Sequence, residues 1–247
     1  MTPPRMNADD RKEAIVLAAL PLFAEFGMNA VKTKMIAQVA GVSEALLYKH
    51  FEDKESIYRA IQKHCVEHAT ETVQALNSLP DDTATLVFCT YALVWKIQKG
   101  PKELRERHSQ VRRLMTRSLL GEGAFAKQFL DATSNLWVDK FRKCIGASIE
   151  NGDLPLDCHD SELGIWFAHH ISVTVALFRL PENTILEYPI DSSALIEKTA
   201  RFCLRGLGLK QESIDQYLDA KEIERFLENY TLQNNGANIP YLKTAGE

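Results

Sequence analysis

Residues 33 to 51 hold two short helical segments separated by a glycine, and this arrangement limits how the chain can fold. The segments are Thr33 to Ala40, with Thr33 as the expected N-cap, and Glu44 to His50, with Ser43 as the expected N-cap. Isolated helices below roughly 12 residues are marginal in water, so the two must pack on each other and on a neighbour. We predict a helix-turn-helix, whose second helix projects outward and can enter a DNA major groove.

The preceding segment supplies that neighbour. Apolar residues recur at helical spacing from Asp9 to Phe26, Gly27 is expected to end the helix, and Pro21 is expected to bend it. This run superficially resembles a signal peptide, but Asp9, Asp10 and Glu13 place negative charge where a signal peptide is positive. We therefore expect a core helix and no membrane insertion.

Composition agrees with a helical protein in a reducing compartment. The 247 residues include only 12 Gly and 9 Pro, so turns are sparse, and the five cysteines show no disulfide or zinc-finger spacing. The predicted fold is all-α, and the predicted location is cytoplasmic. The net charge of −4 arises in residues 211–247, which hold three basic and seven acidic residues, while residues 1–60 are balanced. Bulk charge therefore does not indicate nucleic-acid binding, and local geometry must do so.

Further helices follow from apolar periodicity and from Gly and Pro stops. The expected ranges are 56–79, 82–99, 102–119, 124–150, 160–180, 192–207 and an acidic helix over 212–230. A polar tail containing Asn234, Asn235 and Gly236 is expected to be mobile.

The stretch from Thr33 to Glu55 resembles the N-terminal signature of the TetR family of transcriptional regulators. The matching features are Ile36-Ala37, Gly41-Val42-Ser43, Leu47-Tyr48-x-His50-Phe51 and Lys54-Glu55. The resemblance implies three domains or segments: a three-helix DNA-binding domain over residues 1–55, a larger helical effector-binding and dimerisation domain over 56–210, and an extra acidic helix with a tail over 211–247. It also implies a homodimer on a pseudopalindromic double-stranded DNA operator, with repression as the more common role.

The resemblance assigns DNA contacts residue by residue. It assigns contact with base edges to Glu44, Ala45, Leu46 and Lys49. It assigns contact with phosphates to Thr33, Tyr48, His50 and Lys54. Physical chemistry agrees, because Ser43 caps the second helix and Lys32, Lys34, Lys49 and Lys54 can neutralise phosphates. Glu44 and Leu46 depart from the family pattern, although a carboxylate can accept from cytosine N4 and a leucine can meet a thymine methyl.

The resemblance also implies a small effector, of apolar or aromatic character, bound inside the larger domain. The candidate lining residues are Phe88, Tyr91, Trp95, His108, Phe129, Trp137, Phe141, Trp166, His169 and His170. Ordinary core packing is the alternative for every one of these aromatics, and a satisfied core histidine is the alternative for His108.

A dimer seam is predicted on the last two helices of that domain. Small residues recur every four positions at Gly164, Ala168, Ser172 and Ala176, which permits close helix approach, and the second helix would add Leu195, Thr199 and Phe202. The opposite face, with Trp166, Phe167, Ile171 and Phe178, would then face the subunit's own core. Packing within one chain is the alternative for the small row.

Other candidate sites have simpler explanations. Residues 96–117 carry eight basic against two acidic side chains, which we interpret as a solvated surface paired with the acidic C-terminal helix rather than a second nucleic-acid site. His64 and His68 have chelating spacing, but an exposed polar face explains them, so neither a metal nor a cofactor is expected. No catalytic constellation is present in the sequence, which argues against an enzyme. A helical protein-interaction module that has lost DNA binding is the alternative function.

Overall fold

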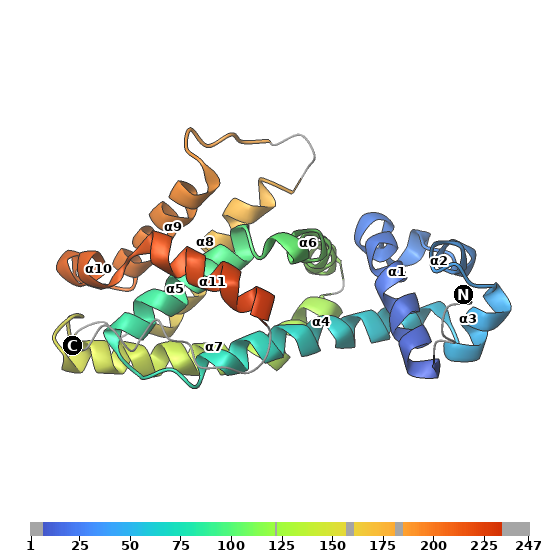
Figure 1. Cartoon of the computed structure of the whole chain (residues 1–247), viewed down its shortest axis with the longest axis horizontal. Helices are drawn as coiled ribbons and strands as arrows, with labels where there is room; N and C mark the ends of the chain where they lie inside the picture. The colour runs from blue at the N-terminus through green and yellow to red at the C-terminus, as the bar shows by residue number, and fades with distance from the viewer. Residues whose placement is uncertain (1–6, 122, 157–160, 181–184, 234–247) are drawn as a thin grey trace. The chain divides into compact units, whose positions relative to one another are not determined.

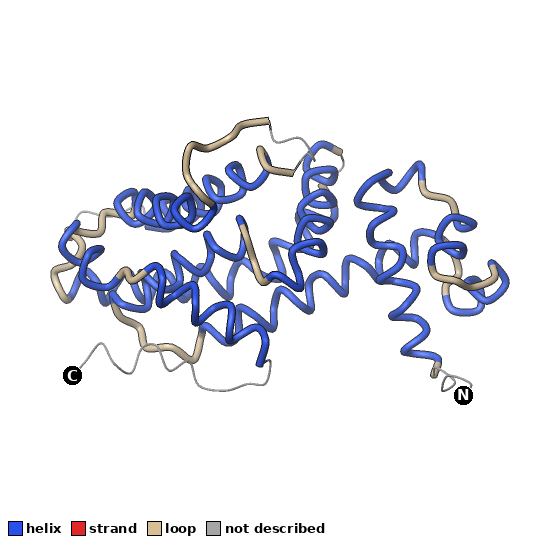
Figure 2. The backbone as a smooth tube through the Cα atoms, turned by 45° about the horizontal axis from the view of Figure 1, so that its top comes forward, coloured by secondary structure: helices blue, strands red, loops and turns tan. Residues whose placement is uncertain are grey.

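A computed structural model describes residues 7–121, 123–156, 161–180 and 185–233. Within these ranges the chain is built of helices and contains no strand, as Figure 2 shows. The predicted all-α fold is confirmed.

Packing divides the chain into two compact units, which are described separately. The first unit comprises residues 1–70 and 109–133, and the second comprises residues 71–108 and 134–247. The predicted domains are continuous stretches that meet at residue 55, whereas each of these units combines two segments that are distant in sequence. The first unit accordingly includes most of the long helix α4, Lys54–Leu76.

The first unit contains α1 (Ala8–Ala30), α2 (Thr33–Val39), α3 (Glu44–His50), most of α4 and of α6 (Arg105–Leu120), and the start of α7 (Ala124–Glu150). Its core is one cluster of buried side chains that draws on all of these helices. Fully or almost fully buried members include Ile15, Ala19, Phe23, Ile36, Leu47, Ile57, Ile61, Leu114 and Phe125. This shared core allows the seven-residue helices α2 and α3 to be stable.

Helix α1 runs from Ala8 through Pro21 and is interrupted at Gly27. The side chain of Asn7 caps it by accepting from the Asp10 backbone N–H at 2.8 Å, and Pro21 lies inside it without ending it. Gly27 has φ 76° and ψ 170°, so the regular helix is interrupted at the predicted position although one more turn follows to Ala30. By length and composition α1 could cross a bilayer, but Ile15 and Phe23 are completely buried in the unit's core.

The second unit is arranged around α5 (Thr83–Gln98), which Asp82 caps and which ends before Gly100 at φ 63°. Helix α5 packs against α8 (Ser161–Leu177), α9 (Ser192–Gly206), α10 (Gln211–Tyr217) and α11 (Ala220–Gln233), as seen in Figure 1. The short 3₁₀ helix Lys102–Leu104 precedes α6. The remainder of α7, after residue 133, completes the unit.

The predicted single helix over 212–230 is wrong, because two helices occupy this region. The chain leaves helical geometry at Leu218, with φ −95° and ψ 88°, and the Asp219 carboxylate accepts from the Glu222 N–H at 3.0 Å. The break lets Ile214 of α10 and Ile223 of α11 both reach complete burial. The predicted mobile tail, with Asn234 to Gly236, lies outside the described residues.

Asp153 fastens α10 to the rest of the second unit. Its carboxylate accepts hydrogen bonds from the Thr83 hydroxyl at 2.6 Å and the Ser213 hydroxyl at 2.5 Å, and its carbonyl accepts from the Lys210 N–H at 3.1 Å. Residues 210–217 therefore belong to the folded unit and are not a loose appendage.

Candidate nucleic-acid interface

Helix α3 presents an exposed polar face, as a DNA-reading helix requires. Ser43 caps it, accepting from the Leu46 N–H at 3.1 Å. Leu47 is buried and ties the helix to the core, while Tyr48 is 51% exposed. Of the other predicted contacts on this helix, Glu44, Ala45 and Lys49 are exposed, and Leu46 and His50 are partly buried. The helix is therefore free to lie along another surface.

The turn between α2 and α3 sets how the two helices cross. Gly41 adopts φ 65°, a conformation that costs glycine little, and the Val42 N–H donates to the Ala37 carbonyl at 2.9 Å. The expectation that Thr33 is the N-cap of α2 is wrong by one residue, because Lys32 occupies that position and makes no side-chain capping bond.

The Thr33 hydroxyl instead connects α2 to α3. It donates to the Glu44 carboxylate at 3.3 Å and accepts from the Tyr48 hydroxyl at 3.3 Å. One predicted base contact, Glu44, and two predicted phosphate contacts are thus brought together. We call the surrounding concave surface, of about 690 Å³, the α2–α3 hollow. It is lined by Lys32, Thr33, Lys34, Glu44, Tyr48, Glu52, Asp53, Lys54 and Glu55.

The hollow contains acids that the sequence analysis did not assign to it. Glu52, Asp53 and Glu55 join Glu44, so four carboxylates face three lysines. Asp53 is also structural: its carboxylate accepts from the Ser56 N–H at 2.6 Å at the start of α4. Elsewhere in this unit, Lys12 Nζ lies 5.4 Å from the centre of the Phe51 ring. The only sign in the sequence that acids would accompany the lysines was the equal number of basic and acidic residues in positions 1–60.

The comparisons with known proteins agree with this geometry. Residues 15–61 match the family model described as bacterial regulatory proteins, tetR family. The transcriptional activator FasR of Mycolicibacterium smegmatis is 28% identical over 83% of this chain and 86% of its own length. The transcriptional regulator RutR of Escherichia coli K12 is 26% identical over 80% of this chain and 90% of its own length.

The fold is shared along the chain as well. A Rhodococcus RHA1 regulatory protein of the tetR family superposes with a TM-score of 0.59 at 21% identity, covering 81% of this chain and 98% of that protein. Residues 15–61 thus match the tetR family, and the chain has the fold of a tetR-family regulator. The chain is accordingly a DNA-binding transcriptional regulator and not an enzyme.

In this chain the predicted effector residues belong mostly to a packed core. Phe88, Tyr91, Trp95, Trp137 and Phe141 are all buried in the core cluster of the second unit. Phe129 is different, because it packs edge-on against Phe125 in the first unit, with ring centres 6.0 Å apart. The prediction that Phe129 lines the effector site with the other aromatics is therefore wrong, because Phe129 packs against the core of the first unit.

The predicted histidines of α8 join an aromatic cluster. His169 stacks on Trp137 with ring centres 5.6 Å apart, and His170 stacks on Trp166 at 5.8 Å. Burial, together with the nearby His170, lowers the pKa of His169 to about 4, so its imidazole is neutral near pH 7. Among the described residues, His169 Nδ1 has no hydrogen-bond partner, and neither do Trp95 Nε1 and the Gln98 amide.

His108 packs closely on the turn after α5. A side chain at Gly100 would lie 2.5 Å from His108 Nδ1, so glycine there makes room for the imidazole. This contact favours the core-packing alternative that the sequence analysis kept for His108. Metal binding has no support among the described residues, where no suitable cluster of ligands occurs, and the His68 side chain lies outside them.

The small residues of α8 pack closely within the chain, which is the alternative that the sequence analysis kept for this row. Ala168, Ser172 and Ala176 are buried, and the Ala168 carbonyl accepts from Cys203 Sγ on α9 at 3.8 Å. A side chain at Gly164 would lie 3.1 Å from Leu207, a close approach that only a small residue permits. Leu195 and Thr199 of α9 are buried as well.

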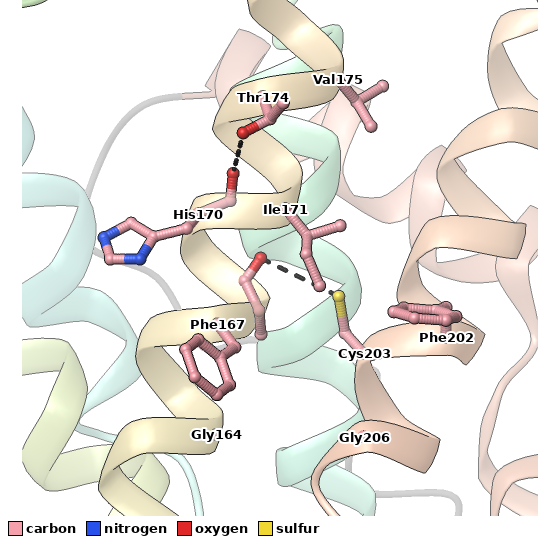
Figure 3. Close-up of a pocket in the computed structure, with 10 residues that line it drawn as sticks. Gly164, Phe167, His170, Ile171, Thr174, Val175, Phe202, Cys203 and Gly206 are labelled. Atoms are coloured by element: carbon pink, nitrogen blue, oxygen red, sulfur yellow. Dashed lines mark hydrogen bonds between the residues drawn. The ribbon is translucent and has the colours of Figure 1, made fainter.

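The face that was expected to point inward does so only in part: Trp166 packs against the core of the second unit, whereas two of its phenylalanines are exposed. Phe167 is 53% exposed, Phe178 is 42% exposed, and Phe202 on α9 is 60% exposed. Between α8 and α9 lies an apolar groove of about 540 Å³, which we call the α8–α9 groove. Figure 3 shows its lining residues, which are Gly164, Phe167, Ala168, His170, Ile171, Thr174, Val175, Phe202, Cys203 and Gly206.

Proposed function

We propose that this regulator is a cytoplasmic repressor that binds a pseudopalindromic operator as a homodimer and is released by a small apolar or aromatic effector. The observation that carries the DNA-binding part is the exposed α3, flanked by the hydroxyls of Thr33 and Tyr48 and by Lys32, Lys34 and Lys54. These groups suit phosphate contact, while Glu44, Ala45, Leu46 and Lys49 suit contact with base edges.

The homodimer is supported by the α8–α9 groove. Phe167 and Phe202 expose aromatic surface on either side of it, and Ile171 and Val175 extend the apolar lining. An apolar patch of this kind marks an interaction surface in a soluble protein. A two-fold pair of chains would place two copies of α3 on half-sites about 34 to 36 Å apart.

The effector is supported by the aromatic cluster and by the orphaned polar atoms of Trp95, Gln98 and His169. A buried polar atom without a partner is costly, and a bound ligand relieves that cost. Release of DNA would be a population shift, for which moving a 1:99 balance to 99:1 needs about 5.5 kcal/mol of differential binding.

The sign of regulation has a direct test. The similar protein from M. smegmatis is an activator, so repression by this chain must be measured rather than assumed. Transcription in vitro from a template carrying the selected operator at the promoter should fall when the protein is added. A rise in transcript would overturn the repressor assignment and leave DNA binding intact.

The DNA-contact assignment is tested by selection from a random duplex pool, followed by gel shifts with variants. Lys54→Ala and Tyr48→Phe should weaken binding to every duplex, and Lys54→Ala should reduce the salt slope by about 1. Glu44→Gln and Leu46→Ala should change which bases are preferred at one position of each half-site. Equal effects of both pairs on operator and random duplexes would contradict these roles.

A protein-interaction module that no longer binds DNA is the second candidate, and one observation favours it: four carboxylates face three lysines in the α2–α3 hollow. The same selection separates the two. A paired inverted motif supports the repressor, whereas no enrichment, with salt-insensitive and uniformly weak binding, supports the interaction module.

A further inference from the structure

A buried carboxylate from the C-terminal helix occupies a set of hydrogen-bond donors on α5 and α9. Glu224 of α11 accepts from the Ser193 hydroxyl at 3.1 Å and from the Tyr91 hydroxyl at 3.5 Å, and it forms an ion pair with Lys99. The Glu224 side chain is only 13% exposed and that of Lys99 only 19%. Three donors from two helices thus converge on one carboxylate.

The donors would be poorly satisfied without a carboxylate. Tyr91 is fully buried, and breaking a buried ion pair by removing one partner leaves an uncompensated charge. Burial alone would lower the pKa of Lys99, but its hydrogen bonds to Glu224 and Glu228 raise it. Glu228 lies 3.2 Å from Lys99 and is about half exposed, so it can neutralise the cation only in part.

The surroundings of this site are apolar. Phe226 of α11 packs edge-on against Phe88 of α5 with ring centres 5.8 Å apart, and Ile223 is completely buried. On the same face of α5, the spacing of Tyr91, Trp95 and Gln98 at i, i+4 and i+7 continues the surface, and Trp95 and Gln98 bear orphaned polar atoms. A ligand here would need one anionic end and an apolar body.

The helix that supplies Glu224 is held by contacts different from those that anchor α10. Helix α11 follows the break at Leu218 and packs on α5, as seen in Figure 1, whereas α10 is held separately by Asp153. Displacing α11 therefore leaves the anchored part of the C-terminal segment in place.

We propose that Tyr91, Lys99 and Ser193 form a carboxylate-binding site, that Glu224 fills it in this state, and that the effector is an apolar carboxylate that replaces Glu224 and releases α11. The proposal rests on the effector-sensing part of the proposed function and names the chemical class of the effector. The planar, two-oxygen occupant and the apolar surroundings favour a carboxylate over inorganic phosphate.

Chemical rescue of the full chain tests the site. Glu224→Ala empties it, and Glu222→Ala is the matched control because Glu222 pairs with Arg225 on the exposed face of the same helix. Hexanoate is the probe, hexanol tests the apolar body alone, and inorganic phosphate tests a simple anion. The measured quantity is the melting temperature at constant ionic strength.

Hexanoate at about a hundredfold excess over its Kd should raise the melting temperature of Glu224→Ala by about 5 to 10 °C. Hexanol, phosphate and the Glu222→Ala control should show far smaller shifts. Adding Lys99→Met to Glu224→Ala should abolish the rescue. Equal shifts with hexanoate and hexanol, or equal responses of the two alanine variants, would overturn the proposal.

Two further measurements keep the proposal testable if Glu224→Ala does not fold. Hexanoate should bind Glu224→Gln at least fivefold more tightly than the unmodified chain, because the internal competitor has lost its charge. In the unmodified chain, saturating hexanoate should speed amide exchange in residues 220–233 and leave 211–217 unchanged. Equal affinities, or unchanged exchange in α11, would refute it.

A gel shift without ligand measures operator binding alone, so failure of the proposed function can be distinguished from failure of the carboxylate site. Loss of operator binding would remove the regulator function, while carboxylate rescue could still succeed. Conversely, a chain that binds its operator but shows no rescue would retain the proposed function and lose only this effector class.

Discussion

The α2–α3 hollow in the first unit and the α8–α9 groove in the second are both exposed, yet they differ in chemistry and in how far apart their residues lie in the sequence. The hollow is polar, and all its lining residues fall between Lys32 and Glu55. The groove is apolar and combines residues 164–175 with residues 202–206. A polar site within one short stretch can be predicted from the spacing of its residues. An apolar surface cannot be distinguished in the sequence from a face that is buried in the core.

The largest expected effect tests whether the α8–α9 groove is the interface of the proposed dimer. Phe167→Asp combined with Phe202→Asp should convert the dimer to monomers, because it places charge on the apolar surface of the groove. Operator affinity should fall at least about 100-fold, since each copy of α3 then binds one half-site alone. Sedimentation velocity and gel shift measure both effects.

Leu156→Asp is the matched control for that pair, because Leu156 is 83% exposed and does not line the groove. It should remain dimeric with unchanged operator affinity. A dimeric double variant would show that the groove is not the seam.

The hollow depends on a core that is shared with neighbouring helices, and Leu47→Ala tests this dependence. Leu47 is 1% exposed beneath α3, so truncation should lower the free energy of unfolding by about 3 kcal/mol and abolish operator binding at 37 °C. Urea unfolding followed by circular dichroism measures the loss. Leu46→Ala, on the more exposed side, should cost far less stability, and equal losses would contradict this view of α3.

The buried aromatic cluster of the second unit should make stability depend on pH. The unfolded His169 takes a proton near its ordinary pKa of 6.5, but the folded one does so only at about 4. Between these values the unfolded state binds more protons, so stability should fall as pH drops through this window, by about 3 kcal/mol in all.

His169→Phe should flatten that part of the pH profile, because the stacked ring remains and the titrating group is gone. Urea midpoints at pH 7, 5.5 and 4.5 measure the slope. A slope as steep as that of the unmodified chain would assign the response to another group.

The smallest expected effect concerns the start of α3. Ser43→Ala removes the hydroxyl that accepts from the Leu46 N–H and should cost about 1 kcal/mol. Ser43→Asp keeps a capping acceptor and should retain most of the stability. Thermal melting distinguishes them, and equal melting temperatures would show that the cap is dispensable.

Much of the fold was predictable from local signals. The cap at Ser43, the break between the two short helices at Gly41 and the helix range Ala124–Glu150 all follow from residue type and spacing, and each is confirmed. Thr33 was misplaced because its hydroxyl found partners on α3, eleven and fifteen residues away, which no helix-capping rule considers.

The all-α fold, the helix-turn-helix and the residues that face outward on α3 can be read from the amino-acid order, because they depend on interactions within a few turns of chain. Packing between distant segments selects which residues of α8 are buried, places Phe129 in a different core from Trp137, and brings Glu224 to Lys99. Both faces of α8 are apolar enough to be buried, and helix spacing alone cannot rank them. The choice is made by close packing against α9, where small residues fit and large aromatics do not.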